Sequence, residues 1–522
     1  MIKLLKAYTD KNDIILELNM ENDKGVSPLL LACDNEEAVK LVMEYANKNN
    51  VILELNKKSK NGNNAIIWAC YENKKEIVQL LIEYANKNGI VLEMNEKNKW
   101  KEFALTYACC NNNIEIIQLL MECSSKNNII LKLNEKDEEK TYPLILAYYN
   151  NVIEIIRLLI EYANKNNIIL TLNDKDKNGY YSLLLACDKN NIEMVQLLID
   201  HANKNNIILE LNEQSNDNNY PLIYACDRDN YEMVQLLVDY ANKNNIILEL
   251  NKKDDSGNYP ILLACFRNNI EIIKFLMDYA NKHNILLEIN EIDGDRAYSL
   301  IYACYKCNIK IIQLLIDYAD NHNFILKLNE KDNNGDYPLL LACYHNNVEI
   351  VRLLIEYANR YNIILDINSK DENNCFPLFF ACEENNYEMV QILVDYATKN
   401  NYILNLNEKI TNNIYPLIIA CSKNNDKIVQ LLISYAEKNN IILELNEKDE
   451  NRAYPLLYAT HVNNIEMVRL LINYAEKNNI TLEINERDNK GNSPLSIAND
   501  KNNNEIIQLL IEYAFKNNFT LE

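Results

Sequence analysis

The chain has 522 residues, of which 48% are hydrophobic, and a formal net charge of −22 at pH 7. This acidic balance disfavours nucleic acid and anionic membrane surfaces as partners, since both attract Lys and Arg rather than Asp and Glu. Two explanations of the charge remain open: it keeps a long, exposed molecule in solution, or it attracts a basic partner.

No targeting segment is evident in the sequence. Residues 1–8 lack the apolar core of a signal peptide. No stretch approaches the roughly 18 consecutive apolar residues that a membrane helix needs. We therefore expect a cytoplasmic protein that does not associate with membranes.

Residues 1–19 match only the second half of a unit that then recurs along the chain, which predicts an N-terminal half repeat that caps the array. A continuous array of thirteen repeats is expected over residues 20–522, because self-similarity at a fixed period is the signature of repeat architectures. One alanine marks each repeat, with a spacing of 37 residues between the first two and 39 residues thereafter. These marker alanines are Ala32, Ala69, Ala108, Ala147, Ala186, Ala225, Ala264, Ala303, Ala342, Ala381, Ala420, Ala459 and Ala498.

Each repeat is predicted to contain a helix, a tight turn, a second helix and an extended return that ends in a polar tip. Proline favours the first helical position, and all nine prolines of the chain lie four residues before a marker alanine. Asn190 and Asn191 are typical of the turn, because Asn tolerates a left-handed backbone. Residues 192–199 carry apolar side chains at helical spacing. Residues 246–251 are too short and too apolar for a third helix, so we expect them to pack on the stack.

The terminal repeats differ from the inner ones. Ser27 and Ser493 precede the first helix and can act as N-caps, whereas Tyr takes this place inside the array. Ser496 in the last repeat suits the polar outer face of a terminal cap. Phe515 and Phe519 instead suggest an end that docks against something, or an array that was once longer. Both interpretations stay open.

One motif appears in fixed order in these repeats, followed by the pattern Asn-x-Glu-Ile-Val-x-Leu-Leu at residues 347–354. It reads Asp332-x-x-Gly335-x-Tyr337-Pro338-Leu339-x-x-Ala342. The motif resembles the D-x-x-G-x-T-P-L-H-x-A pattern of the ankyrin repeat family. The resemblance implies an all-α fold: an ankyrin-type helical-repeat solenoid of about thirteen helix-turn-helix units plus the N-terminal half unit.

The repeats depart from the family pattern in three ways. The family threonine is Tyr in eight repeats, and the family histidine is Leu or Ile in most. We expect apolar packing to take the place of the hydrogen bonds that those two side chains make in the family. Each repeat is also about six residues longer than the usual period of about 33, and the extra residues follow the second helix.

Ten of the fourteen cysteines share one repeat position, directly after the marker alanine. Neighbouring helices lie about 8–10 Å apart, whereas a disulfide needs Cα atoms about 4.4–6.8 Å apart. These cysteines are therefore predicted to be small buried apolar residues in a reducing compartment.

No catalytic, cofactor-binding or metal-binding constellation is apparent. The eight glycines form no phosphate-binding loop. His283 and His322 share a repeat position, but no Cys or His completes a metal site beside them. Cys304 and Cys307 form a lone Cys-x-x-Cys, which without a second pair is weak as a zinc or redox motif. We therefore expect a protein that is not an enzyme.

Three successive repeats differ from the others at the second and third residues after the marker alanine. In the ankyrin family, partners commonly lie across the concave face, and the resemblance places these positions there. Most repeats carry polar or acidic residues at them, as Glu383 and Glu384 illustrate. Aromatic residues and Arg are enriched in binding hot spots. The candidate partner-binding residues are Phe266, Arg267, Tyr305, Lys306, Tyr344 and His345.

The alternative is that these six residues have no role in binding, because single exposed aromatics are ordinary and Tyr is abundant in this chain. Tyr71 and Tyr149 occupy the same repeat position in isolation. For the whole chain we favour a non-enzymatic protein–protein interaction scaffold that binds a protein partner on its concave face. The alternative is a structural or elastic repeat array, or a fragment of a larger protein, with no dedicated recognition site.

Overall fold

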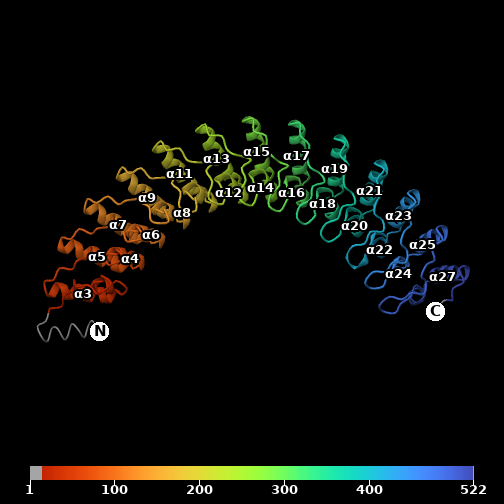
Figure 1. Ribbon diagram of the computed structural model, residues 1–522, viewed down its shortest axis with the longest axis horizontal. Helices are drawn as coiled ribbons and strands as arrows, with labels where there is room; N and C mark the ends of the chain where they lie inside the picture. The colour runs from red at the N-terminus through yellow and green to blue at the C-terminus, as the bar shows by residue number, and fades with distance from the viewer. Residues whose placement is uncertain (1–14, 521–522) are drawn as a thin grey trace. The chain divides into compact units, whose positions relative to one another are not determined.

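The computed structural model describes residues 15–520. Over this range the chain forms α-helices, one short 3-10 helix and irregular segments, without a β-strand. The predicted all-α helical-repeat solenoid is confirmed (Figure 1). Most of the predicted N-terminal half repeat, residues 1–14, lies outside the described residues.

Every repeat contains a short first helix and a longer second helix. The first helices are α2 (Pro28–Ala32), α4 (Ala65–Tyr71), α6 (Ala104–Cys110), α8 (Pro143–Tyr149), α10 (Ser182–Asp188), α12 (Pro221–Asp227), α14 (Pro260–Arg267), α16 (Ser299–Tyr305), α18 (Pro338–Tyr344), α20 (Pro377–Glu383), α22 (Pro416–Ser422), α24 (Pro455–His461) and α26 (Pro494–Asp500). The second helices are α3 (Glu36–Lys48), α5 (Lys75–Asn88), α7 (Ile114–Lys126), α9 (Ile153–Lys165), α11 (Ile192–Lys204), α13 (Tyr231–Lys243), α15 (Ile270–Lys282), α17 (Ile309–Asn321), α19 (Val348–Arg360), α21 (Tyr387–Lys399), α23 (Asp426–Lys438), α25 (Ile465–Lys477) and α27 (Asn504–Lys516). The 3-10 helix η1 (Thr411–Asn413) lies in one loop tip.

The chain divides into two compact units, Met1–Asp255 (unit 1) and Ser256–Glu522 (unit 2). Within each unit the first helices of successive repeats pack side by side, as α4 packs on α6 and α14 on α16. The second helices form a separate row, in which α5 packs on α7 and α23 on α25 (Figure 1). That residues 20–522 form one continuous array stays a prediction.

The helix ends follow from the local sequence. Pro occupies the first turn of nine first helices, and the terminal ones are capped by the side chains of Ser27 and Ser493, as predicted. In the predicted turn Asn190 adopts a left-handed backbone, with φ of 53°. The side chain of Asn191 then caps α11 by accepting a hydrogen bond from the backbone N–H of Met194 at 3.1 Å. In the repeated Asn pair, the first Asn thus turns the chain and the second caps the start of the second helix.

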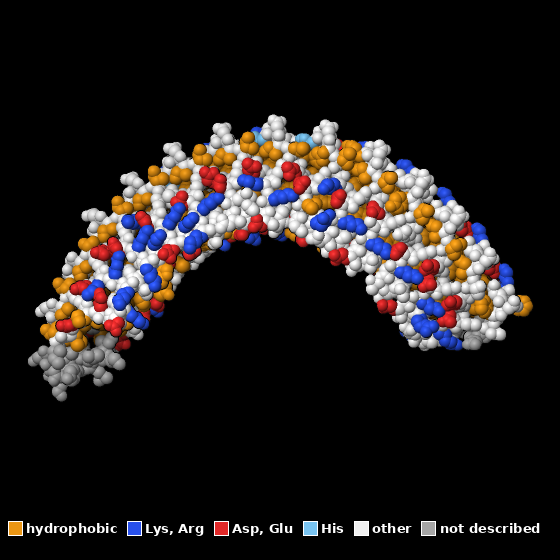
Figure 2. Space-filling model, viewed as in Figure 1, with side chains coloured by type: hydrophobic (Ala, Val, Ile, Leu, Met, Phe, Trp, Pro, Cys, Tyr) orange, Lys and Arg blue, Asp and Glu red, His pale blue; other side chains and the backbone are white. Residues whose placement is uncertain are grey.

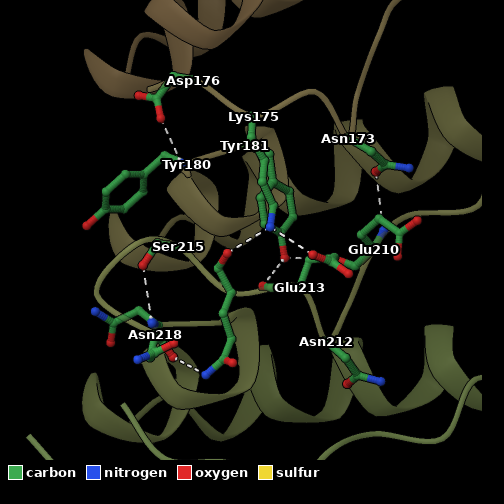
Figure 3. A network of polar contacts seen from close by, with 12 residues as sticks. Asn173, Lys175, Asp176, Tyr180, Tyr181, Glu210, Asn212, Glu213, Ser215 and Asn218 are labelled. Carbon is green, nitrogen blue, oxygen red and sulfur yellow. Dashed lines mark hydrogen bonds and ion pairs between the residues drawn. The ribbon is translucent and has the colours of Figure 1, made fainter. Parts of the chain in front are cut away.

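The tyrosine that replaces the family threonine does more than pack. The Tyr181 side chain is buried, and its hydroxyl donates to the backbone carbonyls of Glu210 and Glu213, which follow the second helix of the same repeat, each at 2.9 Å (Figure 3). Tyr220 repeats the arrangement with Glu249 at 2.8 Å. The structure therefore differs from our expectation of apolar packing alone. The ring fills the core, and the hydroxyl ties the start of the first helix to the return segment of the same repeat.

The six additional residues of each repeat form the predicted extended return. Leu209 and Leu211 of this segment are buried, whereas Ile208 between them is exposed. Asn173 of the preceding repeat holds the segment from both sides (Figure 3), because its side chain donates to the Ile208 carbonyl at 2.7 Å and accepts from the Glu210 N–H at 3.2 Å. The return thus satisfies its backbone through side chains of the neighbouring repeat, without forming a strand.

Candidate functional site

The three aromatic residues of the predicted site end the first helices of their repeats or lie next to the end. Phe266 lies in the last turn of α14, Tyr305 ends α16 and Tyr344 ends α18, all in unit 2. Because α16 packs between α14 and α18, residues at one repeat position come side by side. The exposed fractions are 36% for Phe266 and 52% for both Tyr305 and Tyr344, so the rings face solvent as predicted.

Cations join the rings of neighbouring repeats. The Lys306 ammonium lies 5.3 Å from the ring centre of Phe266 on α14 and equally far from that of Tyr305. The guanidinium of Arg267 lies 5.1 Å from the Phe266 ring centre. These distances are within the range of cation–π attraction. Lys306 therefore connects the first two of the three repeats.

His345 connects the second and third repeats. Its ring makes edge contacts with Tyr305, at 5.8 Å between ring centres, and with Tyr344, at 4.8 Å. Burial lowers the pKa of His345, so Arg267 and Lys306 carry the positive charge of this surface at neutral pH. The structure thus brings all six predicted residues together, and we call them the aromatic–cationic patch.

The sequence analysis missed two rings beneath the patch. Tyr302 and Phe380 each stand directly before a marker alanine, where several repeats have Leu or Ile. Phe266 meets Tyr302, and Tyr344 meets Phe380, both edge to face at 5.1 Å between ring centres. The Tyr302 hydroxyl also donates to Asp293 Oδ2 at 2.6 Å. An aromatic residue before the marker alanine, one repeat after an exposed aromatic, is the signal that could have identified them.

The loop tips of the same repeats are acidic. Asp293 accepts backbone hydrogen bonds from Asp295 at 2.9 Å and Ala297 at 2.8 Å, which closes the tip. Burial and the neighbouring charges of Asp332, Asp371 and Glu372 raise the pKa of Asp336 to about 6. The patch is therefore an island of positive charge and exposed rings beside carboxylates.

Asp227 and Arg228, which hold the equivalent positions one repeat earlier in the sequence, belong to unit 1. Arg228 pairs with Asp188 of the preceding repeat, at 3.0 Å between Nη2 and Oδ1. Its charge is thus balanced locally, unlike that of Lys306, which forms no ion pair with any residue in the described range.

The predicted buried cysteines are confirmed at their repeat position. All ten are buried, as Cys304 is, and burial raises the pKa of the Cys33 thiol to about 12. Cys307 lies in the turn with φ of 52°, in place of the usual Asn. The rings of His283 and His322 pack at a tilt against the rings of Tyr279 and Tyr318 in the last turn of the preceding helix. No group of three potential metal ligands occurs among residues 15–520.

A row of exposed aliphatic side chains was also missed by the sequence analysis. We expected the whole apolar return to pack on the stack, but its second residue points outward in repeat after repeat. In Figure 2 hydrophobic side chains recur along the repeats of each unit. The row comprises Ile52, Val91, Ile130, Ile169, Ile208 and Ile247 in unit 1, and Leu286, Ile325, Ile364, Ile403 and Ile442 in unit 2, each at least half exposed.

No helix in the part of the chain that the structure describes is long and apolar enough to cross a membrane. A family model described as ankyrin repeats (three copies) matches the sequence in overlapping segments. The matched segments are residues 1–91, 88–169, 162–248, 244–325, 322–403, 363–442, 397–480 and 417–520.

Comparison with solved structures gives matches to 529 chains. One of them is the ankyrin repeat domain of Bcl-3, described as a unique member of the IkappaB protein family. It is 19% identical, covers 49% of this chain and 99% of its own, and superimposes with a TM-score of 0.35. A search of the curated proteins finds no match.

Proposed function

The chain belongs to the ankyrin repeat family, and from this membership we propose that it is a non-enzymatic scaffold that binds a protein partner on its concave face. By concave face we mean the side formed by the first helices and loop tips. Ankyrin repeats are in general protein–protein interaction modules. Each repeat contacts only its neighbours, so such a fold presents a broad surface rather than a closed catalytic cavity.

The observation that carries the proposal is the continuity of the aromatic–cationic patch over three repeats. Lys306 bridges α14 and α16, and His345 bridges α16 and α18. Exposed aromatics beside Arg are typical of binding hot spots. A partner that presents carboxylates flanked by apolar side chains would match both the rings and the cations.

We further propose a reducing, cytoplasmic location, and a partner that is neither nucleic acid nor membrane. The buried, unpaired cysteines support the reducing compartment. The net charge of −22 opposes binding to phosphate-rich surfaces.

An affinity pull-down from the native cell extract tests the patch. The intact chain is compared with the triple variant Phe266→Ala/Tyr305→Ala/Tyr344→Ala. A matched control, Ser422→Ala/His461→Ala/Asp500→Ala, changes the same repeat position elsewhere in unit 2. Circular dichroism first establishes that all three proteins are folded.

We expect one or more proteins that the intact chain and the control retain and the triple variant loses. Equal retention by all three proteins would exclude the patch as the binding site. If no protein is retained at moderate salt, the alternative of a structural or elastic array becomes the better explanation.

A further inference from the structure

Both tryptophans of the chain line one pocket in unit 1. Trp68 lies on α4, and Trp100 lies in the loop tip before α6. The tips of the other repeats have polar residues at the position of Trp100, yet Trp100 is 40% exposed. The pocket has a volume of about 480 Å³. Trp100 is therefore not explained by the needs of the repeat.

Polar contacts hold the aromatic rings of the pocket. The Trp68 indole N–H donates to Asp34 Oδ1 at 2.9 Å, and the Tyr107 hydroxyl donates to Glu102. Tyr71 is 53% exposed and meets Tyr107 edge to face, at 5.1 Å between ring centres. The rings thus form a positioned aromatic wall.

Carboxylates also line the pocket. Glu102, Asp137, Glu138 and Glu139 line the pocket. Lys177 neutralises Glu139, at 2.7 Å between Nζ and Oε1. Glu138 has no ion pair with any residue of the described range. The nearby Lys99 ammonium lies 4.3 Å from the Trp100 ring centre and donates to Asn61 Oδ1 at 2.8 Å. The Trp100 ring therefore already makes a cation–π contact within the chain.

One buried acceptor in the pocket wall lacks a donor. Asn63 is only 6% exposed, and its Oδ1 atom has no hydrogen-bond partner. Buried polar atoms are nearly always paired, so an unpaired one calls for an explanation. A donor carried by a ligand in the pocket would supply the missing partner.

We propose that this pocket binds the guanidinium group of an arginine in a basic segment of a partner protein. The wall offers aromatic rings, carboxylates and an unpaired amide oxygen, which together suit a ligand that only donates hydrogen bonds. Guanidinium is planar, carries five N–H donors and stacks on aromatic rings, whereas an ammonium is a compact, strongly hydrated charge. The inference rests on the proposed function only in taking the ligand from a polypeptide.

Tryptophan fluorescence of the full chain tests the proposal directly, because both fluorophores line the pocket. The probe is the peptide acetyl-Gly-Ser-Arg-Ser-Gly-amide, compared with the same peptide carrying citrulline or lysine. Citrulline keeps the shape of arginine and removes its charge. We expect a saturable change with the arginine peptide, a weaker one with lysine and none with citrulline.

Two variants locate the binding. Tyr71→Leu removes a ring, and we expect about tenfold weaker binding. Glu138→Gln removes one exposed charge, and we expect about threefold weaker binding. The variant Phe266→Ala/Tyr305→Ala/Tyr344→Ala in unit 2 should bind the arginine peptide as the intact chain does, so failure of the patch and failure of the pocket are distinguishable.

The absence of a saturable change with the arginine peptide would overturn the proposal. Equal binding of the citrulline peptide would overturn the role of charge, and tighter binding of the lysine peptide would overturn the assignment to arginine.

Discussion

The aromatic–cationic patch of unit 2 and the tryptophan pocket of unit 1 use the same repeat positions and carry opposite charge. In both, the second residue after one marker alanine meets the residue before the next. Tyr71 and Tyr107 meet edge to face at 5.1 Å, as do Phe266 and Tyr302. The residue that follows the exposed ring is Glu72 in unit 1 and Arg267 in unit 2.

This difference shows that the repeat fixes the geometry of the paired rings but not the charge around them. The packing of neighbouring first helices sets the distance between the two rings. The charge around them comes from the loop tips and from the ends of the first helices, where side chains are exposed. One scaffold can thus present rings to partners of either charge.

Charge reversal in the patch should have the largest effect. We expect Arg267→Glu/Lys306→Glu to weaken binding of the retained partner by about 30-fold or more, since hot-spot residues contribute about 2 kcal/mol or more each. Binding is measured by titration of the purified partner. Arg267→Lys/Lys306→Arg preserves the charge and should retain most of the affinity.

The same reversal should leave the arginine peptide bound to the tryptophan pocket. An unchanged affinity of the partner for Arg267→Glu/Lys306→Glu would show that the positive charge of the patch does not contribute to binding. The charge contrast between the two surfaces would then have no functional meaning.

Replacing the covered ring of each surface tests the shared geometry. Tyr302→Leu removes a ring contact and the hydrogen bond to Asp293, and Tyr107→Leu removes the corresponding pair with Tyr71 and Glu102. We expect each change to lower the free energy of unfolding by about 1–2 kcal/mol. Urea unfolding followed by circular dichroism measures it.

Leu fits this repeat position, as Leu263 and Leu341 show elsewhere in the chain, so the loss should reflect the ring and the hydroxyl. A loss in one variant but not in the other would contradict the common geometry of the two surfaces.

The smallest effect is expected from an acidic tip beside the patch. The pKa of Asp336 is raised from 3.8 to about 6, so folding favours its protonated form. Its ionised form therefore costs stability increasingly as pH rises from about 4 to about 6. We expect Asp336→Asn to raise the free energy of unfolding at pH 7 by at most about 1 kcal/mol, because the carboxyl is only half buried.

Urea unfolding of Asp336→Asn at pH 7 and at pH 4 measures this effect, and the difference from the intact chain should vanish at pH 4. Glu102 holds the same repeat position in unit 1 but accepts the Tyr107 hydroxyl bond. Replacing Glu102 by Gln should therefore not raise the free energy of unfolding. If both the Glu102 and the Asp336 variants were more stable than the intact chain, the proposed difference between the two carboxylates would be wrong.

The repeating parts of the fold could be predicted from the sequence because each depends on local chemistry. Pro at the first helical position, Asn190 in the left-handed turn and Cys304 in the core all follow from residue type and position. The six patch residues were found because three successive repeats carry aromatic and basic residues at two positions where most repeats carry polar or acidic ones, although their role in binding stays a prediction.

The remaining features depend on how separate segments of the chain come together in three dimensions, which residue type alone does not reveal. Trp68 and Trp100 come from different repeats and line one pocket only when helix and tip stack. The hydroxyl of Tyr181 bonds to a backbone atom of the return segment, 29 residues further along the chain. Ile208 is as apolar as Leu209, and only the alternation of the extended backbone decides that the first is exposed.

The most direct test of the scaffold proposal is photo-cross-linking from the patch itself. A photoreactive p-benzoylphenylalanine replaces Tyr305 in one protein and His461, at the same repeat position, in another. Both are irradiated in native cell extract. We predict a protein adduct from position 305 that is absent from position 461 and disappears when Arg267→Glu/Lys306→Glu is added. No adduct from position 305, or the same adducts from both positions, would contradict a partner bound at the patch.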